Sequence, residues 1–262
     1  PAIMAYSLLY PYSDNILDDA ELSYADKVAF SKRFESRLAG KGAMAANSRE
    51  NKISALVGMI EEQFPRALYP EVHGSLMAIH RAQTQSLQLS GAKAELTDEE
   101  ILRISFDKGG CSVLADGYLV AGTLPEEISR FFYGYGVWLQ LADDIQDISE
   151  DIRNNTRTLF SDHRNQQERV LLTNKTFHFG RRILEDIKYC KSDVSISFGK
   201  VILQSIEWMM IQSAGTNNGF YPEAYTRKLE QFTPLRFQFL KDVKKKGMPG
   251  RLKLVTQLMD QQ

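Results

Sequence analysis

Apolar side chains recur at the three- and four-residue spacing of α-helices along almost the whole chain, and this periodicity constrains the fold most. Runs in which β-branched residues alternate with polar ones, as strands require, are missing. The sequence therefore predicts an all-α protein. The expected helices span residues 14–38, 48–62, 71–89, 97–122, 125–153, 165–191, 194–214 and 223–246.

Local sequence signals predict where one helix begins and ends, and the chain length predicts the number of domains. Thr97 with Glu100 three residues later is a capping box, and the helix that it begins should run to about Gly122. No linker or repeat divides the chain, so we expect one domain spanning residues 1–262. Because the chain starts at Pro1 rather than Met, we expect the native N-terminus to have been trimmed.

Composition argues against several functional classes. A formal net charge of -1 predicts no nucleic-acid partner, since phosphate binding needs a basic surface. Two cysteines, Cys111 and Cys190, cannot form the disulfide framework of a secreted protein, so we expect a cytoplasmic location. No apolar run approaches the roughly 18 residues that a bilayer span needs. The sequence leaves open whether the protein is a monomer or a homodimer, and whether it associates peripherally with a membrane.

Two acidic clusters interrupt the apolar pattern. Asp14 and Asp18 are four residues apart, so on a helix they share one face and repel each other. A run of this kind is most often a solvated acidic face. The second cluster forms two overlapping stripes on a helix, one made by Asp143, Asp147 and Asp151 and the other by Gln140, Asp144, Asp147 and Asp151.

The residues before the second cluster indicate that it is not an ordinary solvated face. Residues 131–141 are apolar nearly all round, which is typical of a buried helix, and the acidic stripe continues this helix. Buried like charges need cations. Carboxylates without His or Cys nearby favour Mg²⁺, which completes its shell with water and substrate phosphate. Two such clusters facing each other would hold a diphosphate through several magnesium ions.

These acidic stretches also resemble those of a known family. Residues 136–147, with 150–153 after them, resemble the second aspartate-rich motif of squalene and phytoene synthases and the DDxxD motif of polyprenyl synthases. Residues 14–18 resemble the first motif of that group and begin 129 residues before Asp143. A closer similarity is to the bacterial large terpene synthases, the group that includes tetraprenyl-β-curcumene synthase. It is carried by residues 12–19, 108–120 and 232–241.

The resemblance implies the class I isoprenoid synthase fold, an antiparallel helical bundle around a central apolar cavity. It implies a magnesium-dependent terpene synthase that ionises a long linear prenyl diphosphate, releases diphosphate and forms a linear or cyclic terpene. It assigns Asp14, Asp18 and Asp147 to catalysis. The metal ligands that it implies are Asp14, Asp18, Asp143, Asp147 and Asp151, with Asp144 as a second choice.

Three basic residues are candidates for binding the diphosphate. Lys108 precedes two glycines in mid-helix, each costing about 1 kcal/mol relative to alanine, which indicates close backbone approach to a substrate or a neighbouring helix. A plain surface lysine is the competing interpretation. Arg153 follows the acidic stripe, and its alternative role is to pair with Glu150. Arg236 lies between two apolar residues near the C-terminus.

A carbocation needs a dry cavity, and aromatic rings stabilise cations. The candidates for lining such a cavity are Tyr118, Phe132, Tyr135 and Gln140, although core packing is the competing role for each ring.

Two other functions stay open. One is head-to-head condensation of two prenyl diphosphates. Residues 120–122 match the Val-Ala-Gly of squalene synthases, but Asp116 stands where those enzymes carry a tyrosine, which disfavours this function. The other is a non-catalytic isoprenoid-binding helical protein, which would not need both acidic motifs.

Overall fold

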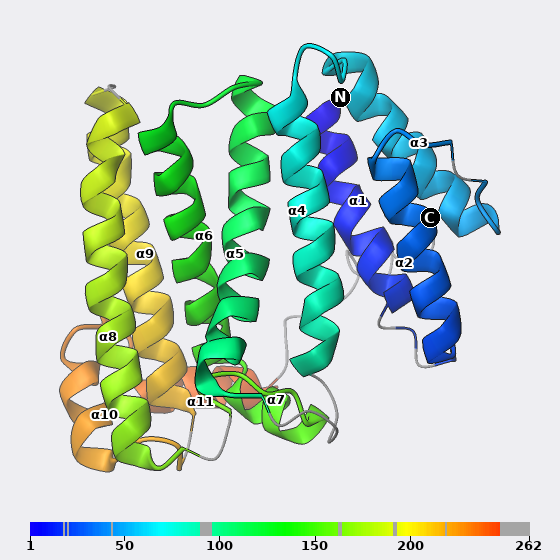
Figure 1. Cartoon of the computed structure of the whole chain (residues 1–262). Coiled ribbons are helices and arrows are strands. Elements are labelled where there is room, and N and C mark those ends of the chain that lie inside the picture. The colour runs from blue at the N-terminus through cyan, green and yellow to red at the C-terminus, as the bar shows by residue number, and fades with distance from the viewer. Residues whose placement is uncertain are drawn as a thin grey trace.

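The computed structural model describes residues 1–17, 19, 21–42, 44–89, 96–161, 164–190, 193–217 and 219–246, and of 193–196 and 244–246 the backbone alone. Within these ranges the protein is all-α, with eleven α-helices, two short 3₁₀-helices and no strand. The helices pack into a bundle (Figure 1). The prediction of an all-α fold is confirmed. None of the described helices is both long enough and apolar enough to cross a membrane.

Three long helices with alternating direction form the centre of the bundle (Figure 1). They are α4 (Pro70–Ser86), α5 (Asp98–Ala121) and α6 (Glu126–Gln146). On one side of this centre pack α1 (Ala2–Leu17), α2 (Tyr24–Leu38) and α3 (Ser48–Gln63). On the other side pack α8 (Gln166–Leu184) and α9 (Asp193–Thr216).

Shorter helices gather at the lower end of the bundle in Figure 1, where α6 ends. They are α7 (Ile148–Asn154), α10 (Glu223–Glu230) and α11 (Phe237–Lys246). The two 3₁₀-helices, Leu87–Leu89 and Glu185–Cys190, extend α4 and α8.

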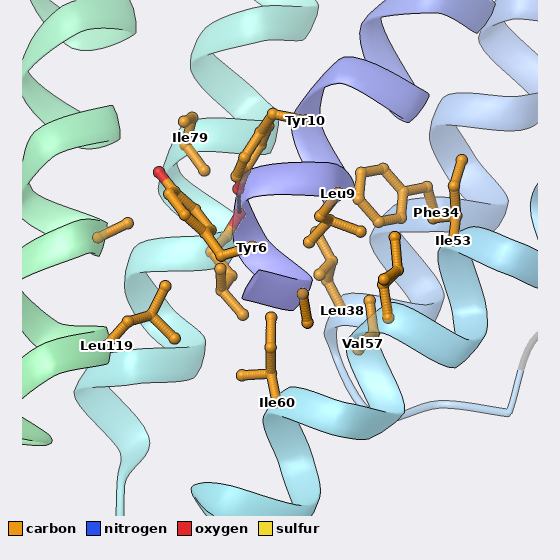
Figure 2. Close-up of a cluster of buried hydrophobic side chains, with 14 of the residues drawn as sticks. Tyr6, Leu9, Tyr10, Phe34, Leu38, Ile53, Val57, Ile60, Ile79 and Leu119 are labelled. Carbon is orange, nitrogen blue, oxygen red and sulfur yellow. Dashed lines mark hydrogen bonds between the residues drawn. The ribbon is translucent and has the colours of Figure 1, made fainter. Parts of the chain in front are cut away.

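The apolar faces of these helices meet in two main buried clusters. In the first, Leu9 of α1 packs among Phe34 of α2 and Ile53 of α3 (Figure 2). The second surrounds Trp138 of α6, which is fully buried together with Phe160. Removal of this apolar surface from water provides the main driving force for folding.

The predicted start and end of α5 are confirmed. The Thr97 hydroxyl accepts a hydrogen bond from the Glu100 amide at 3.3 Å, and the Glu100 carboxylate accepts one from the Thr97 amide at 2.8 Å. Gly122 ends the helix with a φ of +77°, in the region that glycine adopts without steric cost.

The prediction of one helix over 14–38 is wrong. α1 already begins at Ala2 and contains Pro11, and a new helix starts at Tyr24. Burial of apolar residues such as Leu9 on both sides of Pro11 offsets the hydrogen bond that proline cannot donate. Ser23 caps the second helix, because its hydroxyl accepts a hydrogen bond from the Asp26 amide at 3.2 Å.

The predicted helix over 125–153 is interrupted at Asp147, which lies between α6 and α7. A residue far along the chain explains this break. The Asn217 side chain, just beyond α9, donates hydrogen bonds to the carbonyl oxygens of Ile145 at 2.9 Å and Gln146 at 3.4 Å. These carbonyl oxygens would otherwise accept hydrogen bonds from the backbone amides of a continuing helix.

The predicted helix over 223–246 is also divided, into α10 and α11. Pro234 lies in the intervening turn and has no amide hydrogen to donate. The Glu230 carboxylate then caps α11 by accepting a hydrogen bond from the Phe237 amide at 2.7 Å.

Candidate active site

A cavity of about 410 Å³ lies where helices from both sides of the bundle meet its centre. Its lining comes from α1, α4, α5, α6 and α9. Side chains that are apolar or aromatic cover much of the wall, namely Tyr10, Ile79, Val113, Leu139 and Met209. The polar lining consists of Asp14, Gln83, Lys108, Ser112, Gln140 and Asp143.

Asp14 and Asp143, which come from the two acidic clusters, both line this cavity. Each lies in the last turn of its helix, α1 and α6 respectively, and both helices end toward the lower side in Figure 1. The C-terminal end of a helix carries partial negative charge, which adds to the charge of the carboxylates. This corner of the cavity therefore favours cations.

Lys108 of α5 lines the same cavity and places a cation beside the carboxylates. Its charge acts to lower the pKa values of Asp143, Asp144 and Asp151, against the larger effect of burial in each case. The Lys108 side chain is itself exposed, so it combines a position in the cavity lining with access to solvent.

Two glycines hold α5 and α6 close together at this level. A Cβ at Gly109 would lie 2.5 Å from both the carbonyl oxygen of Gly136 and the Cβ of Gln140. The next residue, Gly110, lies against the ring of Tyr133. The glycine pair after Lys108 thus serves the approach of a neighbouring helix, and this approach sets where Lys108 lies relative to α6.

The second acidic cluster keeps its four-residue spacing across the break at Asp147. The Asp147 amide donates to the Asp143 carbonyl at 2.9 Å, and the Asp151 amide donates to the Asp147 carbonyl at 2.8 Å. Burial, and then the charge of Asp147, raise the pKa of Asp143 and raise that of Asp151 to about 6. The three carboxylates therefore repel one another in the metal-free protein.

Asp144 lies in the core rather than at the cavity. It is only 4% exposed, and its Oδ1 accepts a hydrogen bond from Gln140 Nε2 at 2.9 Å. Its Oδ2 is buried without a hydrogen-bond partner among the described residues. Burial raises the pKa of Asp144 to about 7. Gln140 thus connects the cavity wall to a buried carboxyl group.

The residues fit a magnesium site in donor type, because the acidic groups here are all carboxylates, the ligands that Mg²⁺ prefers. Within the described ranges, no group of three or more His, Cys, Asp or Glu side chains is gathered closely enough to hold a metal ion. Asp18 lies outside the described residues. A diphosphate would have to supply part of the coordination shell, as is usual for magnesium.

The other two candidates for diphosphate binding lie apart from the cavity. Arg153 is exposed, and its guanidinium is 3.7 Å from the Glu150 carboxylate. Arg236 is exposed in the turn before α11, where it lines a separate cavity of about 420 Å³ with residues of α10.

The three predicted aromatic residues are not among the described residues that line the cavity. The Tyr118 hydroxyl lies 3.2 Å from the Ser129 hydroxyl. Phe132 packs beside Phe131, and Tyr135 stacks on Phe131 with the ring centroids 6.1 Å apart. These contacts fit core packing, which was the competing role for each ring. Gln140 does line the cavity.

Four lining residues, Tyr10, Ile79, Gln83 and Met209, lie outside the sequence stretches that carry the family resemblance and were not candidates. Gln83 is 6% exposed, and its Oε1 is buried without a hydrogen-bond partner among the described residues. In the sequence, Gln83 is linked to the lining residue Ile79 only because it follows four residues later on α4. Such spacing is common in any helix, so it does not identify a cavity residue.

Comparison with known proteins adds no relative. No model of a protein family matches the chain, and no curated protein matches its sequence.

Proposed function

We propose that the chain is a magnesium-dependent class I terpene synthase with the isoprenoid synthase fold, acting on a long linear prenyl diphosphate. One observation carries this proposal. Asp14 and Asp143, from the two acidic motifs far apart in the sequence, line one cavity together with Lys108. A solvated acidic face on either helix would give no reason for carboxylates from both to share a cavity with a lysine.

The chain's own residues would divide the work as follows. Asp14 on one side and Asp143 on the other, with Asp147 and Asp151 beyond it, would hold magnesium at the end of the cavity where α1 and α6 end. Bound magnesium would stabilise the negative charge that develops on the diphosphate as its bond to carbon breaks. Lys108 would bind a phosphate oxygen and add a fixed positive charge.

The apolar wall would receive the hydrocarbon chain. Ile79, Val113 and Leu139 would exclude water, which would otherwise capture the carbocation. Tyr10, the aromatic residue among the described lining residues, would help to stabilise the positive charge.

Incubation of the full chain with prenyl diphosphates of ten to thirty-five carbon atoms, with magnesium or with EDTA, tests the proposal. We expect magnesium-dependent release of diphosphate and a hydrocarbon product detectable by mass spectrometry. A product with twice the carbon number of its substrate would instead support head-to-head condensation. Binding of these compounds without diphosphate release would support the non-catalytic isoprenoid-binding protein and contradict the enzyme.

The matched variants are Asp143→Asn and Glu150→Gln. Asp143 lines the cavity, whereas Glu150 is an exposed acid nearby on α7, with its side chain 61% exposed. We expect the first variant to abolish most of the diphosphate release and the second to retain it.

A further inference from the structure

Helix α11 and the turn before it expose several apolar side chains to solvent. Phe239 and Val243 are four residues apart on α11 and therefore share one of its faces. Leu235 and Phe232 are exposed in the preceding turn. We call these four residues, together with Arg236, the α11 surface. Neighbouring exposed apolar side chains of this kind mark interaction sites on soluble proteins.

The other side of α11 holds the helix on the bundle. Phe237 is buried, and its ring lies against Gly215 near the end of α9. Leu240 packs against the buried cluster around Trp138. Because these contacts fix the rotation of α11, the side that carries Phe239 and Val243 faces away from the core.

Positive charge accompanies the apolar side chains. Residues 232–246 hold five basic residues and one acidic residue, in a chain whose formal net charge is -1. Arg236 is exposed, and it makes no ion pair with a described residue. The α11 surface is therefore both apolar and locally basic.

A small cavity adjoins this surface. Arg227 and Arg236 line it together with Gln231, Thr233 and Glu230, and its volume is about 420 Å³. The Glu230 carboxylate already accepts the hydrogen bond from the Phe237 amide. The guanidinium of Arg236 is available to an anionic group such as a phosphate ester, which arginine binds well.

We propose that the α11 surface docks on a lipid bilayer that contains anionic phospholipids. Phe232 and Phe239 enter the boundary between headgroups and acyl chains, and Arg236 binds a lipid phosphate. Apolar side chains beside basic ones are the combination by which interfacial helices bind anionic membranes. The association is peripheral, since none of the described helices is suited to cross a bilayer.

Charge distinguishes the bilayer from a second copy of the chain as the occupant. In a symmetric dimer the same surface of both copies meets, so their basic segments 232–246 would repel each other. An anionic bilayer complements this charge and accepts the apolar side chains at the same time.

Docking would also bring one end of the candidate active site close to lipid. α11 lies at the end of the bundle where α1 and α6 end, next to the carboxylates of the cavity (Figure 1). A long prenyl diphosphate has an anionic head and an apolar tail, as a lipid does, and could enter from the bilayer. This consequence rests on the proposed function, whereas the docking itself does not.

Co-sedimentation of the full chain with vesicles tests the docking. One set of vesicles is phosphatidylcholine alone, and the other is equal parts of phosphatidylcholine and phosphatidylglycerol. We expect binding to the mixed vesicles at low salt. Binding should be weaker by about tenfold or more on phosphatidylcholine alone, and weaker again at high salt.

Two variants locate the contact, and each has a matched control. Phe239→Ala should weaken binding to the mixed vesicles by about tenfold, and Arg236→Gln by about fivefold. Phe198→Ala alters a phenylalanine of similar exposure, 59% against 56% for Phe239, near the start of α9. Arg130→Gln alters an exposed arginine near the start of α6. Both controls lie away from α11 and should bind as the wild type does. Circular dichroism of each variant checks folding.

Several results would overturn the inference. They are no binding to the mixed vesicles, equal binding to both kinds of vesicle at any salt concentration, and equal loss of binding in the variants and their controls. A dimer in sedimentation velocity that Phe239→Ala dissociates would show that a second copy covers the surface, and would also overturn it. The assay contains no prenyl diphosphate, so its failure leaves the proposed function standing.

Discussion

Gly109 of α5 and Gly136 of α6 lie in such close contact that neither position has room for a side chain. The contact lies beside the cavity, with Lys108 next to one glycine in sequence and Gln140 one helical turn after the other. It fixes the separation of the two helices that carry the cationic and the second acidic part of the candidate site.

Gly136→Ala should destabilise the protein by about 1–3 kcal/mol, because its Cβ would overlap the Gly109 carbonyl and force the helices apart. Urea unfolding measures this change in the free energy of unfolding. Gly74→Ala is the control, since a Cβ at this exposed position of α4 meets nothing within 4 Å. The control should be stabilised by up to about 1 kcal/mol, the difference in helix propensity. Equal stability of the two variants would contradict the tight packing.

Asn217→Ala should loosen the junction at Asp147, because two carbonyls at the end of α6 lose their hydrogen-bond donor. We expect a loss of about 1 kcal/mol in the free energy of unfolding. If Asn217 positions Asp147, diphosphate release should also weaken, mainly as a higher KM for the prenyl diphosphate. Asn51→Ala, at an exposed position of α3, should change neither quantity appreciably. An unchanged KM in Asn217→Ala would mean that the junction does not influence the site.

Asp147→Ala should separate catalysis from folding. The Asp147 side chain makes no capping hydrogen bond to α7, and its charge raises the pKa values of Asp143 and Asp151. Its removal should leave the metal-free protein equally or slightly more stable, and both pKa values should fall in an NMR titration. Diphosphate release should fall by on the order of 100-fold or more, since each 1.36 kcal/mol of lost stabilisation is about tenfold in rate. Wild-type turnover by this variant would refute the role of the second motif.

The metal-free protein should lose stability as the pH rises through the range set by Asp144 and Asp151. Their folded-state pKa values are raised to about 7 and about 6, so the folded protein holds protons that the unfolded chain releases near pH 4. Their stabilising effect is complete below about pH 4 and is lost as the pH rises to about 7.

Thermal melts between about pH 5 and 8 measure this effect, which should reach at most a few kcal/mol. Asp144→Asn removes the most strongly shifted group and should flatten the profile in this range. An unchanged pH profile in the variant would show that Asp144 does not carry a raised pKa.

Several features of the fold could be predicted from the sequence because the signals lie within a few residues. The helical spacing of apolar residues is sufficient for the all-α class. The ends of α5 follow from Thr97, Glu100 and Gly122, whose capping interactions involve only neighbours in the chain. The glycine pair after Lys108 indicated close backbone approach, with a substrate or a helix as the alternatives.

Other features required contacts between distant segments. Nothing near Asp147 indicates a helix break, because the group that caps α6 there is Asn217, at the end of α9. In the same way, Pro11 in isolation predicts a helix boundary, whereas burial of the residues around it keeps α1 continuous.

The candidate site shows the same division. The sequence determined which residues carry acidic and basic groups, and that helical spacing groups the acids within each motif. Helical spacing alone could not place Asp14 and Asp143 around one cavity, which only the family resemblance implied, and it could not place Tyr118 and Tyr135 away from that cavity. Spacing along one helix determines which residues share a face. Which faces meet depends on packing, such as the glycine contact between α5 and α6, and this arises only when the whole bundle buries its apolar surface.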